Sequence, residues 1–444
     1  MLVFCRRNTR GLAMSSLLLT SLVLGVACGP NAEQEDSTEV SAPTQPGDEI
    51  ASAGPTEPGE LTTPVEPEED LEAVPAEQAD QTEQLTTTDP SQDTLVTAQA
   101  VTGLRTVAAW EQLFLKRWNS EHTSFLAMSN SLDSWQFYNL GYGIDGNTAM
   151  FRATGKTQYL DRALQYVNNV VAHAKVSKSL PKSQFKDAYL GWASARSDTL
   201  GQEVPLFESY CWRYVTNLLR TMRETPAIYG NANYRAQYEK LLAFTEKNMF
   251  EKWYKRGANA YLYRVNTHMA SHWAYIAMDL ARLTTDAAKK ATYLTVVNNI
   301  NLHLPNYRSS LRQQLGTSAT NSGAYFWSEN WASHARPGQD VAHGNGVMAY
   351  VVEAHDVGTE WTDADIHKFA TTLNSIIWPS ASRYGNYVDG TGSGTGWFND
   401  GFVKLGRYDS NLQHRFETHT VGNNTQFYGN GALNARFLLN GKVP

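Results

Sequence analysis

The chain has 444 residues, with 37 Lys and Arg against 44 Asp and Glu, and contains three cysteines. Three cysteines exclude a disulfide framework and a cysteine metal cluster. The net charge of −7 is unevenly spread, because residues 31–100 contain 18 acidic and no basic residues, whereas 101–444 carry a net charge of +8. A positive folded region favours polyanionic partners such as acidic polysaccharide, nucleic acid or an anionic envelope, although so modest a charge can also be unspecific.

The first 27 residues have the pattern of a secretory signal. Arg6, Arg7 and Arg10 precede the apolar run 17–24, which is too short to span a bilayer permanently. The small residues before Cys28 resemble a bacterial lipobox, except that Gly25 stands where leucine is usual. The resemblance implies cleavage before Cys28 and lipidation of its thiol; plain secretion is the alternative. Both predict a location in the cell envelope or outside the cell, and a lipid on Cys28 would be the one membrane contact.

Residues 28–101 are predicted to be a disordered linker. Between 31 and 100 the chain is rich in Pro, Glu and Thr and lacks Lys, Arg, Cys and aromatic residues. Such a segment cannot bury enough apolar surface to offset the entropy lost on ordering. The predicted organisation is therefore a signal in 1–27, a tether in 28–101 and one folded domain in 102–444.

The sequence of the folded part predicts a series of helical hairpins. Residues 102–128 predict a first helix, and strand-like alternation is confined to short stretches such as 260–263. Each further pair combines a helix, a tight turn and a returning helix. The predicted pairs are 134–151 with 159–167, 205–222 with 234–253, 267–283 with 291–303, 340–354 with 364–378 and, more weakly, 397–416 with 425–439.

Five or six such hairpins close most naturally into a ring. The turn Thr154-Gly155-Lys156-Thr157-Gln158-Tyr159 and the residues after it resemble a turn of the (α/α) toroids of carbohydrate-active enzymes. We therefore expect an all-α fold, an incomplete (α/α)5–6 toroid. The long connectors 178–204 and 305–339 would then lie over one end of the ring and form a cleft. An open, protein-binding solenoid is the alternative, but its repeats should be more alike.

An Asn and two His stand at the start of the predicted helix 267–283. The free backbone N–H groups of a helix start favour an anion, and Asn266 and His268 could both hydrogen-bond a carboxylate there. Cleavage of a uronic acid glycan by β-elimination needs such a carboxylate to be neutralised, so that a base can remove the C5 proton. His272, one turn later, is a supporting candidate, and Asn266 could equally be a plain N-cap.

These residues resemble the site of the toroidal uronate lyases, of which alginate lyases are the familiar members. Those sites combine an Asn-His pair with a tyrosine somewhat over fifty residues later, and here Tyr325 follows His268 by 57 residues. The resemblance implies that Asn266 and His268 neutralise the carboxylate and that Tyr325 is the base or the acid. The family's Asn and His are adjacent, whereas Thr267 separates them in this chain.

A second group of polar residues surrounds the start of the helix 340–354. Arg336 could grip a carboxylate with two parallel N–H bonds, and Asp340 is placed to orient His343. Gly344 and Gly346 together cost a helix about 2 kcal/mol relative to alanine, which indicates a close approach there. Zinc binding by Asp340 and His343 lacks a third ligand at helical spacing, so we expect no metal and no cofactor.

Aromatic residues and one carboxylate complete the candidate substrate contacts. Trp135, Tyr138 and Trp327 could stack on sugar faces, although most tryptophans in helices belong to the core. Glu208 is a carboxylate on a predicted inner helix.

The sequence therefore predicts a surface-tethered, monomeric polysaccharide lyase acting on a uronic acid glycan. One alternative is an inverting glycoside hydrolase using Glu208 with Glu329 or Asp340. The other is a non-catalytic glycan-binding lipoprotein. A cysteine protease built on Cys211 and a nucleic-acid-binding protein both lack a motif.

Overall fold

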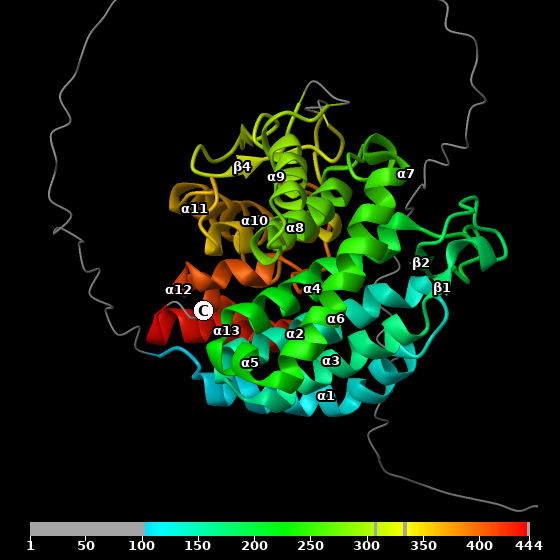
Figure 1. Cartoon of the computed structure of the whole chain (residues 1–444). Coiled ribbons are helices and arrows are strands. Elements are labelled where there is room, and N and C mark those ends of the chain that lie inside the picture. The colour runs from blue at the N-terminus through cyan, green and yellow to red at the C-terminus, as the bar shows by residue number, and fades with distance from the viewer. Residues whose placement is uncertain (1–102, 306–308, 332–334, 442–444) are drawn as a thin grey trace, which may run out of the picture. The chain divides into compact units, whose positions relative to one another are not determined.

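The computed structural model describes residues 103–305, 309–331 and 335–441. The expected signal in 1–27, Cys28 and the expected linker 28–101 lie outside these residues. The described part is all-α, as predicted, with two small antiparallel strand pairs (Figure 1). The pairs are β1 (Lys175–Val176) with β2 (Leu190–Gly191), and β3 (Gly316–Thr317) with β4 (Tyr325–Phe326). None of the helices in these ranges is both long and apolar enough to cross a bilayer.

Six elements form the inner ring of the expected toroid. In chain order they are α2 (Phe137–Thr154), α4 (Pro205–Glu224), α8 (Thr267–Leu283), α10 (Val341–Asp356), the short 3-10 helix η5 (Phe402–Arg407) and α13 (Thr425–Asn440). Each packs against the next, and α13 packs against α2, so the circuit is closed.

A second set of helices packs outside the ring, each against an inner neighbour. These are α1 (Val107–Ser129), α3 (Thr157–Ala172), α6 (Ala232–Thr245), α9 (Ala287–Leu302), α11 (Asp363–Thr371) and α12 (Ser410–Thr418). Shorter elements extend them: α5 (Pro226–Gly230), α7 (Lys252–Tyr261), the 3-10 turns η1 (Ser134–Gln136) and η2 (Ser177–Ser179), and the π-helical turns η3 (Glu246–Glu251) and η4 (Thr372–Ile377).

The last hairpin departs from the prediction, because 397–416 is not one helix. Asn345 of α10 holds this segment as a loop: its Nδ2 donates to the Trp397 carbonyl, and its Oδ1 accepts from the N–H groups of Gly401 and Phe402. Helical structure begins only at Phe402. The strand-like alternation near 260–263 does not form a strand: α7 ends at Tyr261, and a turn follows it.

Two glycines bring α2 and α13 together and so close the ring. A Cβ atom at Gly146 would lie 2.7 Å from the carbonyl oxygen of Thr425, and Gly429 faces the Gly146 backbone in the same way. The two helices therefore touch backbone to backbone. A side chain at either position would push them apart.

The connectors meet the ring where its helices begin. The N–H of Ser134, just before α2, donates to Ala193, that of Thr267 donates to Glu329, and that of Val341 donates to Asn386. Segments 178–204 and 305–339 therefore do reach one end of the ring, as expected. The loop near Asn386, which the sequence did not single out, joins them there.

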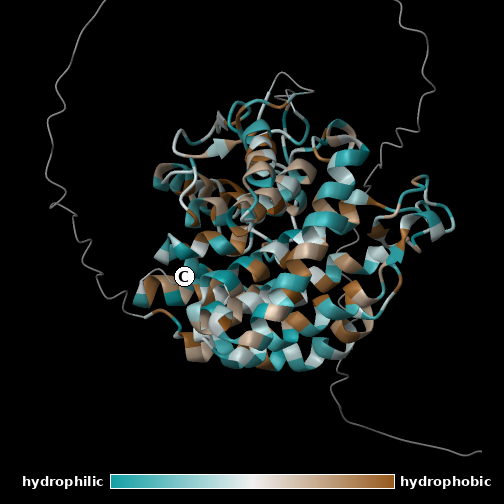
Figure 2. Ribbon diagram, viewed as in Figure 1, coloured by the Kyte–Doolittle hydropathy of each residue, from teal (hydrophilic) through white to brown (hydrophobic). Residues whose placement is uncertain are grey.

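The helices carry both apolar and polar residues (Figure 2). Their apolar faces form one large buried cluster across the ring and its outer layer. A satellite cluster of Val204, Leu206, Phe207 and Met269 lies beside it, covered by Trp135 and Tyr138.

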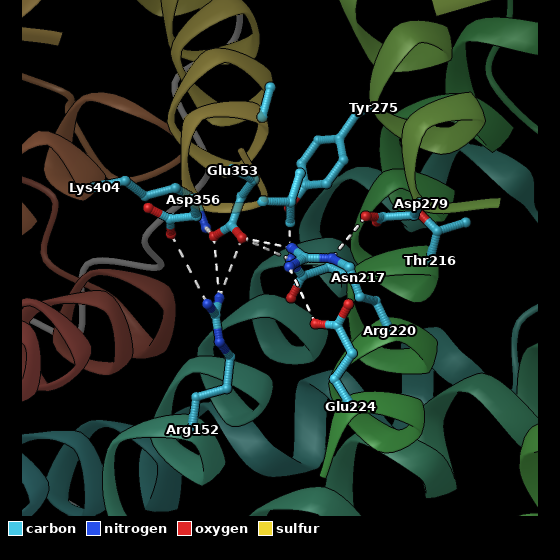
Figure 3. A network of polar contacts seen from close by, with 12 residues as sticks. Arg152, Thr216, Asn217, Arg220, Glu224, Tyr275, Asp279, Glu353, Asp356 and Lys404 are labelled. Atoms are coloured by element: carbon cyan, nitrogen blue, oxygen red, sulfur yellow. Dashed lines mark hydrogen bonds and ion pairs between the residues drawn. The ribbon is translucent and has the colours of Figure 1, made fainter. Parts of the chain in front are cut away.

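Inside the ring, a buried carboxylate joins several helices (Figure 3). Glu353 of α10 is fully buried and accepts hydrogen bonds from Arg152 of α2 at 3.2 Å, Arg220 of α4 at 2.7 Å and Arg407 of η5 at 2.7 Å. Burial alone would raise the pKa of Glu353, but the surrounding arginines and Lys404 hold it well below its ordinary value. The carboxylate stays charged and ties four inner elements together.

Replacing this carboxylate tests its structural role. Glu353→Gln should lower the free energy of unfolding by roughly 3–5 kcal/mol, because it leaves buried cations without their anion. Glu239→Gln, on the exposed face of α6, is the matched control and should change it by less than about 0.5 kcal/mol. Urea unfolding of both variants measures the difference, and equal effects would show that Glu353 does not hold the ring together.

Candidate active site

A small cavity opens where the inner helices begin. It has a volume of about 10 Å³, which is room for about one water molecule. Four inner helices and the loop before η5 contribute to its wall. The lining residues are Tyr138, Tyr210, His268, His272, Ala342, His343, Gly346 and Asp400.

Two of the wall residues are buried histidines one turn apart on α8. His268 and His272 are 4% and 1% exposed, and among the described residues neither Nδ1 of His268 nor either ring nitrogen of His272 has a hydrogen-bond partner. Burial first, and then neighbouring positive charge, lower the pKa of both imidazoles well below the ordinary value. Both rings are therefore neutral at neutral pH.

A third imidazole, from α10, faces these two. The ring of His343 stacks on His268 with 4.2 Å between centroids, and its Nδ1 lies 2.6 Å from Oδ2 of Asp340. Burial would raise the pKa of the Asp340 carboxyl, but the hydrogen bonds from His343 lower it below its ordinary value. Because a carboxylate can only accept, Nδ1 of His343 carries the proton, and the orientation of the ring is set.

Asp340 also explains why α10 begins here. It is the N-cap residue of the helix, and its Oδ1 accepts the backbone N–H of His343 at 3.0 Å. One carboxylate thus caps the helix and orients the imidazole, as the sequence suggested.

An ion pair lies beside the cavity, and its acidic member, Asp400, is part of the cavity wall. Nη2 of Arg213 on α4 lies 2.6 Å from Oδ2 of Asp400, and both side chains are buried. The guanidinium lies over the rings of Tyr210 and Tyr214, 4.2 and 4.7 Å from their centroids. Asp400 lines the cavity, so charge is available at its wall.

Tyrosines from α2 and α4 make up the remaining side. Tyr138 stacks on Tyr210 with 4.1 Å between ring centroids, and the Tyr210 hydroxyl donates to Tyr142 at 3.4 Å. Burial and the charge of Asp400 raise the pKa of the Tyr210 phenol well above its ordinary value. This phenol therefore keeps its proton at neutral pH and can donate it.

Tyr325 does not line the cavity. Its hydroxyl donates to Asp365 at 2.7 Å, and its ring packs on Phe369 of α11, an outer helix. Asp365 belongs to the capping box at the start of α11 with Thr362. Burial and this carboxylate raise the pKa of Tyr325 to about 12. The spacing of 57 residues therefore does not bring the phenol and His268 into one site.

Asn266 also lies outside the cavity wall. It is the N-cap residue of α8 but makes no side-chain capping bond; its Nδ2 lies 3.4 Å from the Glu329 carboxylate. Arg336 is exposed, with its guanidinium over Phe326 and 3.8 Å from Asp389. Neither residue contributes to the group around His268.

Other predicted contacts divide between the core and the cavity mouth. Glu208 is fully buried and holds Lys252 and the Trp253 indole N–H, so no sugar reaches it. Trp327 is buried against Phe369 and Phe402 and offers no open face. Trp135 is half-buried and packs on Tyr138, which does line the cavity.

Two residues of this group escaped the sequence analysis: Tyr210, which lines the cavity, and Arg213, whose Nη2 lies 2.6 Å from Oδ2 of Asp400. Both lie on α4, where Arg213 has no charged residue three or four positions away, which is a signal of a partner elsewhere in the fold. That partner is 187 residues away, and nothing local in the sequence identifies it.

No cluster of three or more His, Cys, Asp or Glu side chains in the described ranges is arranged to hold a metal ion. A wider hollow of about 500 Å³ lies near the opposite ends of α4 and α8, between Glu224, Met278 and Leu294. Its walls lack buried, unpaired polar groups, so the smaller cavity is the better candidate for chemistry.

Comparison with known proteins finds similarity in structure but not in sequence. No family model matches the sequence, and no curated protein matches it. A solved structure described as a polysaccharide lyase is similar over 75% of this chain and 96% of that chain, with 12% identity and a TM-score of 0.40. At this level the chemistry of the cavity has to be argued from its own residues.

The neutral histidines predict a pH dependence of stability. In the unfolded chain an imidazole titrates near a pKa of about 6.5, whereas in the folded protein His272 stays neutral to lower pH. The unfolded state therefore binds more protons, and the free energy of unfolding falls as the pH drops below about 6.5. His272→Gln should reduce this slope by up to about 1.4 kcal/mol per pH unit.

Urea unfolding between about pH 5 and pH 7.5 measures that slope. His303→Gln, at an exposed histidine, is the control and should leave it as in the wild-type protein. An unchanged slope in His272→Gln would mean that His272 is not held neutral by the fold.

Proposed function

We propose that this protein is a polysaccharide lyase that cleaves a uronic acid glycan by β-elimination at the mouth of this cavity. The observation that carries the proposal is the convergence of three imidazoles and a proton-holding phenol on one space. One of those imidazoles, that of His343, is oriented by a carboxylate.

The reaction needs a base and an acid on one sugar residue. The base removes the proton on C5, next to the carboxylate, a C4=C5 double bond forms, and the bond from C4 to O4 breaks. The acid gives a proton to the departing O4. No water is consumed, and the new chain end is an unsaturated uronate.

His343 is the proposed base. Asp340 holds its Nδ1–H, so the opposite nitrogen carries the lone pair, and the negative charge of Asp340 stabilises the imidazolium that forms. His268, stacked on His343, keeps the ring in place and can hydrogen-bond the substrate through its own ring.

Tyr210 is the proposed acid, in place of Tyr325. Its raised pKa keeps the phenol protonated, and stacking on Tyr138 fixes the ring at the cavity wall. Tyr138 and the half-buried Trp135 continue this aromatic surface outward, where apolar sugar faces can pack. Asn266 and Arg336 have no part in this arrangement.

The net charge of +8 in 101–444 favours an acidic polysaccharide as the substrate. We propose that the protein works as a monomer outside the cytoplasm, held at the cell envelope by a lipid on Cys28 or secreted.

Burial argues against the glycoside hydrolase alternative. Glu208 is closed off by Lys252 and Trp253, and the Glu329 carboxylate lies near Asn266. Asp340 is engaged with His343, so the three carboxylates that the sequence suggested for an inverting hydrolase do not form a pair on either side of one scissile bond.

Product analysis tests the proposal on alginate, glucuronan and glycosaminoglycans. We expect the ultraviolet absorbance of a conjugated unsaturated uronate to rise with at least one of them. His343→Asn and Tyr210→Phe should each lower kcat by roughly 100- to 10,000-fold, since each removes a proton-transfer group. Tyr325→Phe is the matched control and should retain activity.

Saturated reducing ends, with loss of activity in Glu208→Gln, would instead identify a hydrolase. Salt-sensitive binding without any product would identify a glycan-binding protein. Full activity in both His343→Asn and Tyr210→Phe would exclude the assigned roles.

A further inference from the structure

The segment between α3 and α4, residues 173–204, stands out from the helices beside β1 and β2 and is called the projection below (Figure 1). Its unpaired charges are all positive. Each of its lysines is exposed, and within the described ranges none has a carboxylate partner. These lysines are Lys175, Lys178, Lys182 and Lys186.

The acidic residues of the projection are already paired with arginines. Asp187 lies 2.9 Å from Arg256, and Asp198 lies 3.0 Å from Arg196. Glu203 is also held by Arg256, at 3.3 Å. The projection therefore presents lysines whose charge no neighbouring carboxylate offsets, and such a surface attracts an anionic partner.

The projection is fixed to the body of the protein. The Glu203 carboxylate is buried and accepts hydrogen bonds from the hydroxyls of Ser177 at 3.0 Å and Ser183 at 2.6 Å. The ring of Phe185 packs edge-on against Trp253, with 5.5 Å between centroids. The lysines are thus displayed on a preformed scaffold, so little conformational entropy of the backbone is lost when they meet a partner.

Two exposed leucines belong to the same region. Leu132 is 60% and Leu200 is 48% exposed, which makes them the most exposed large apolar side chains of the described residues. Backbone bridges join Asp133 and Leu200 to the same short stretch, residues 193–194. The two leucines are therefore carried by segments that adjoin one another.

A lysine of the projection lies against one of these segments. The N–H of Lys182 donates to the carbonyl of Gly201, next to Leu200, at 3.2 Å. A Cβ atom at Gly201 would lie 3.0 Å from Cγ of Lys182. A single exposed leucine needs no explanation, but two leucines beside unpaired lysines on a projecting segment indicate an interaction surface.

This combination fits an anionic bilayer better than a glycan. Lysines are attracted to anionic headgroups, and projecting leucines can enter the boundary between headgroups and acyl chains. An acidic glycan would also attract the lysines, but sugars pack on the flat faces of aromatic rings, which leucines do not provide. The signal pattern of residues 1–27 predicts a location at the envelope or outside the cell, where the protein can meet a membrane surface.

We infer that the projection, together with Leu132, is a docking surface for an anionic lipid bilayer. Lys178 and Lys182 contact the headgroups, and Leu132 and Leu200 enter the interface. The docking does not require a lipid on Cys28, and it is independent of the reaction proposed at the cavity.

Cosedimentation with vesicles tests this surface. The protein is the chain from residue 28 onward with Cys28→Ser, so that no lipid is attached. The vesicles consist of phosphatidylcholine with phosphatidylglycerol as the anionic lipid, or of phosphatidylcholine alone. We expect binding to the anionic vesicles that weakens as the salt concentration rises, and little binding to the neutral ones.

Two double variants remove the two components of the surface. Lys178→Gln with Lys182→Gln should weaken binding to the anionic vesicles roughly 10- to 30-fold, because two attractive charges are lost. Leu132→Ser with Leu200→Ser should weaken it roughly 10-fold, because less apolar surface enters the interface. All four positions are on the surface or at its edge, and an unchanged melting temperature verifies that the variants remain folded.

Matched controls lie on other helices. Lys240→Gln with Lys290→Gln removes the same charge from exposed positions of α6 and α9, and Leu294→Ser with Leu302→Ser removes two exposed leucines of α9. Each control should change the binding by less than about 3-fold, because these side chains lie away from the docked surface.

Absence of a preference for anionic vesicles in the unsubstituted protein would overturn the inference. Equal losses in the controls and in the variants of the projection would overturn it as well, because the attraction would then be unspecific. If the projection variants bind vesicles as before but bind alginate more weakly, the surface belongs to a glycan and not to a membrane.

Discussion

The ring depends on one buried carboxylate. Glu353 projects from α10 into a space that α2, α4 and η5 also face, and each of these elements supplies an arginine to it. None of these charges is stable alone inside the protein, because removing an ion from water costs more than any single contact returns. Only the assembled ring provides all partners at once (Figure 3). The interaction therefore favours the closed arrangement over partly formed ones.

A chain of polar contacts leads from this centre to the cavity. Lys404 lies 3.7 Å from Glu353 and 3.0 Å from Asp145, Asp145 accepts from Gln426, and Gln426 approaches Asp400, the partner of Arg213. The interior of the ring is thus polar along its length, with apolar packing between the inner and outer helices. Side chains at the cavity are held by neighbours that are themselves fixed, which favours a preorganised site.

The two ends of the inner helices have different polar surroundings. Where the helices begin, loops hydrogen-bond to their first residues. The cavity at this end is lined by imidazoles, phenols and the carboxylate of Asp400. At the other end of α2, Arg152 lies in the last turn, where a cation interacts favourably with the helix terminus. The polarity of the helices therefore suits acidic ligands at the first end and internal charge pairing at the second.

Local patterns in the sequence determined most of the helical hairpins, the all-α ring and the group formed by Asp340 and His343. Helical periodicity and a three-residue separation on one helix act over a few residues, so they can be read directly. His268 and His272 were singled out for the same reason. Tertiary structure alone decided that His343 stacks on His268, that Arg213 finds Asp400 187 residues away, and that Tyr325 turns to Asp365. Those contacts depend on which helix faces meet across the ring, and spacing along the chain does not determine distance across a closed structure.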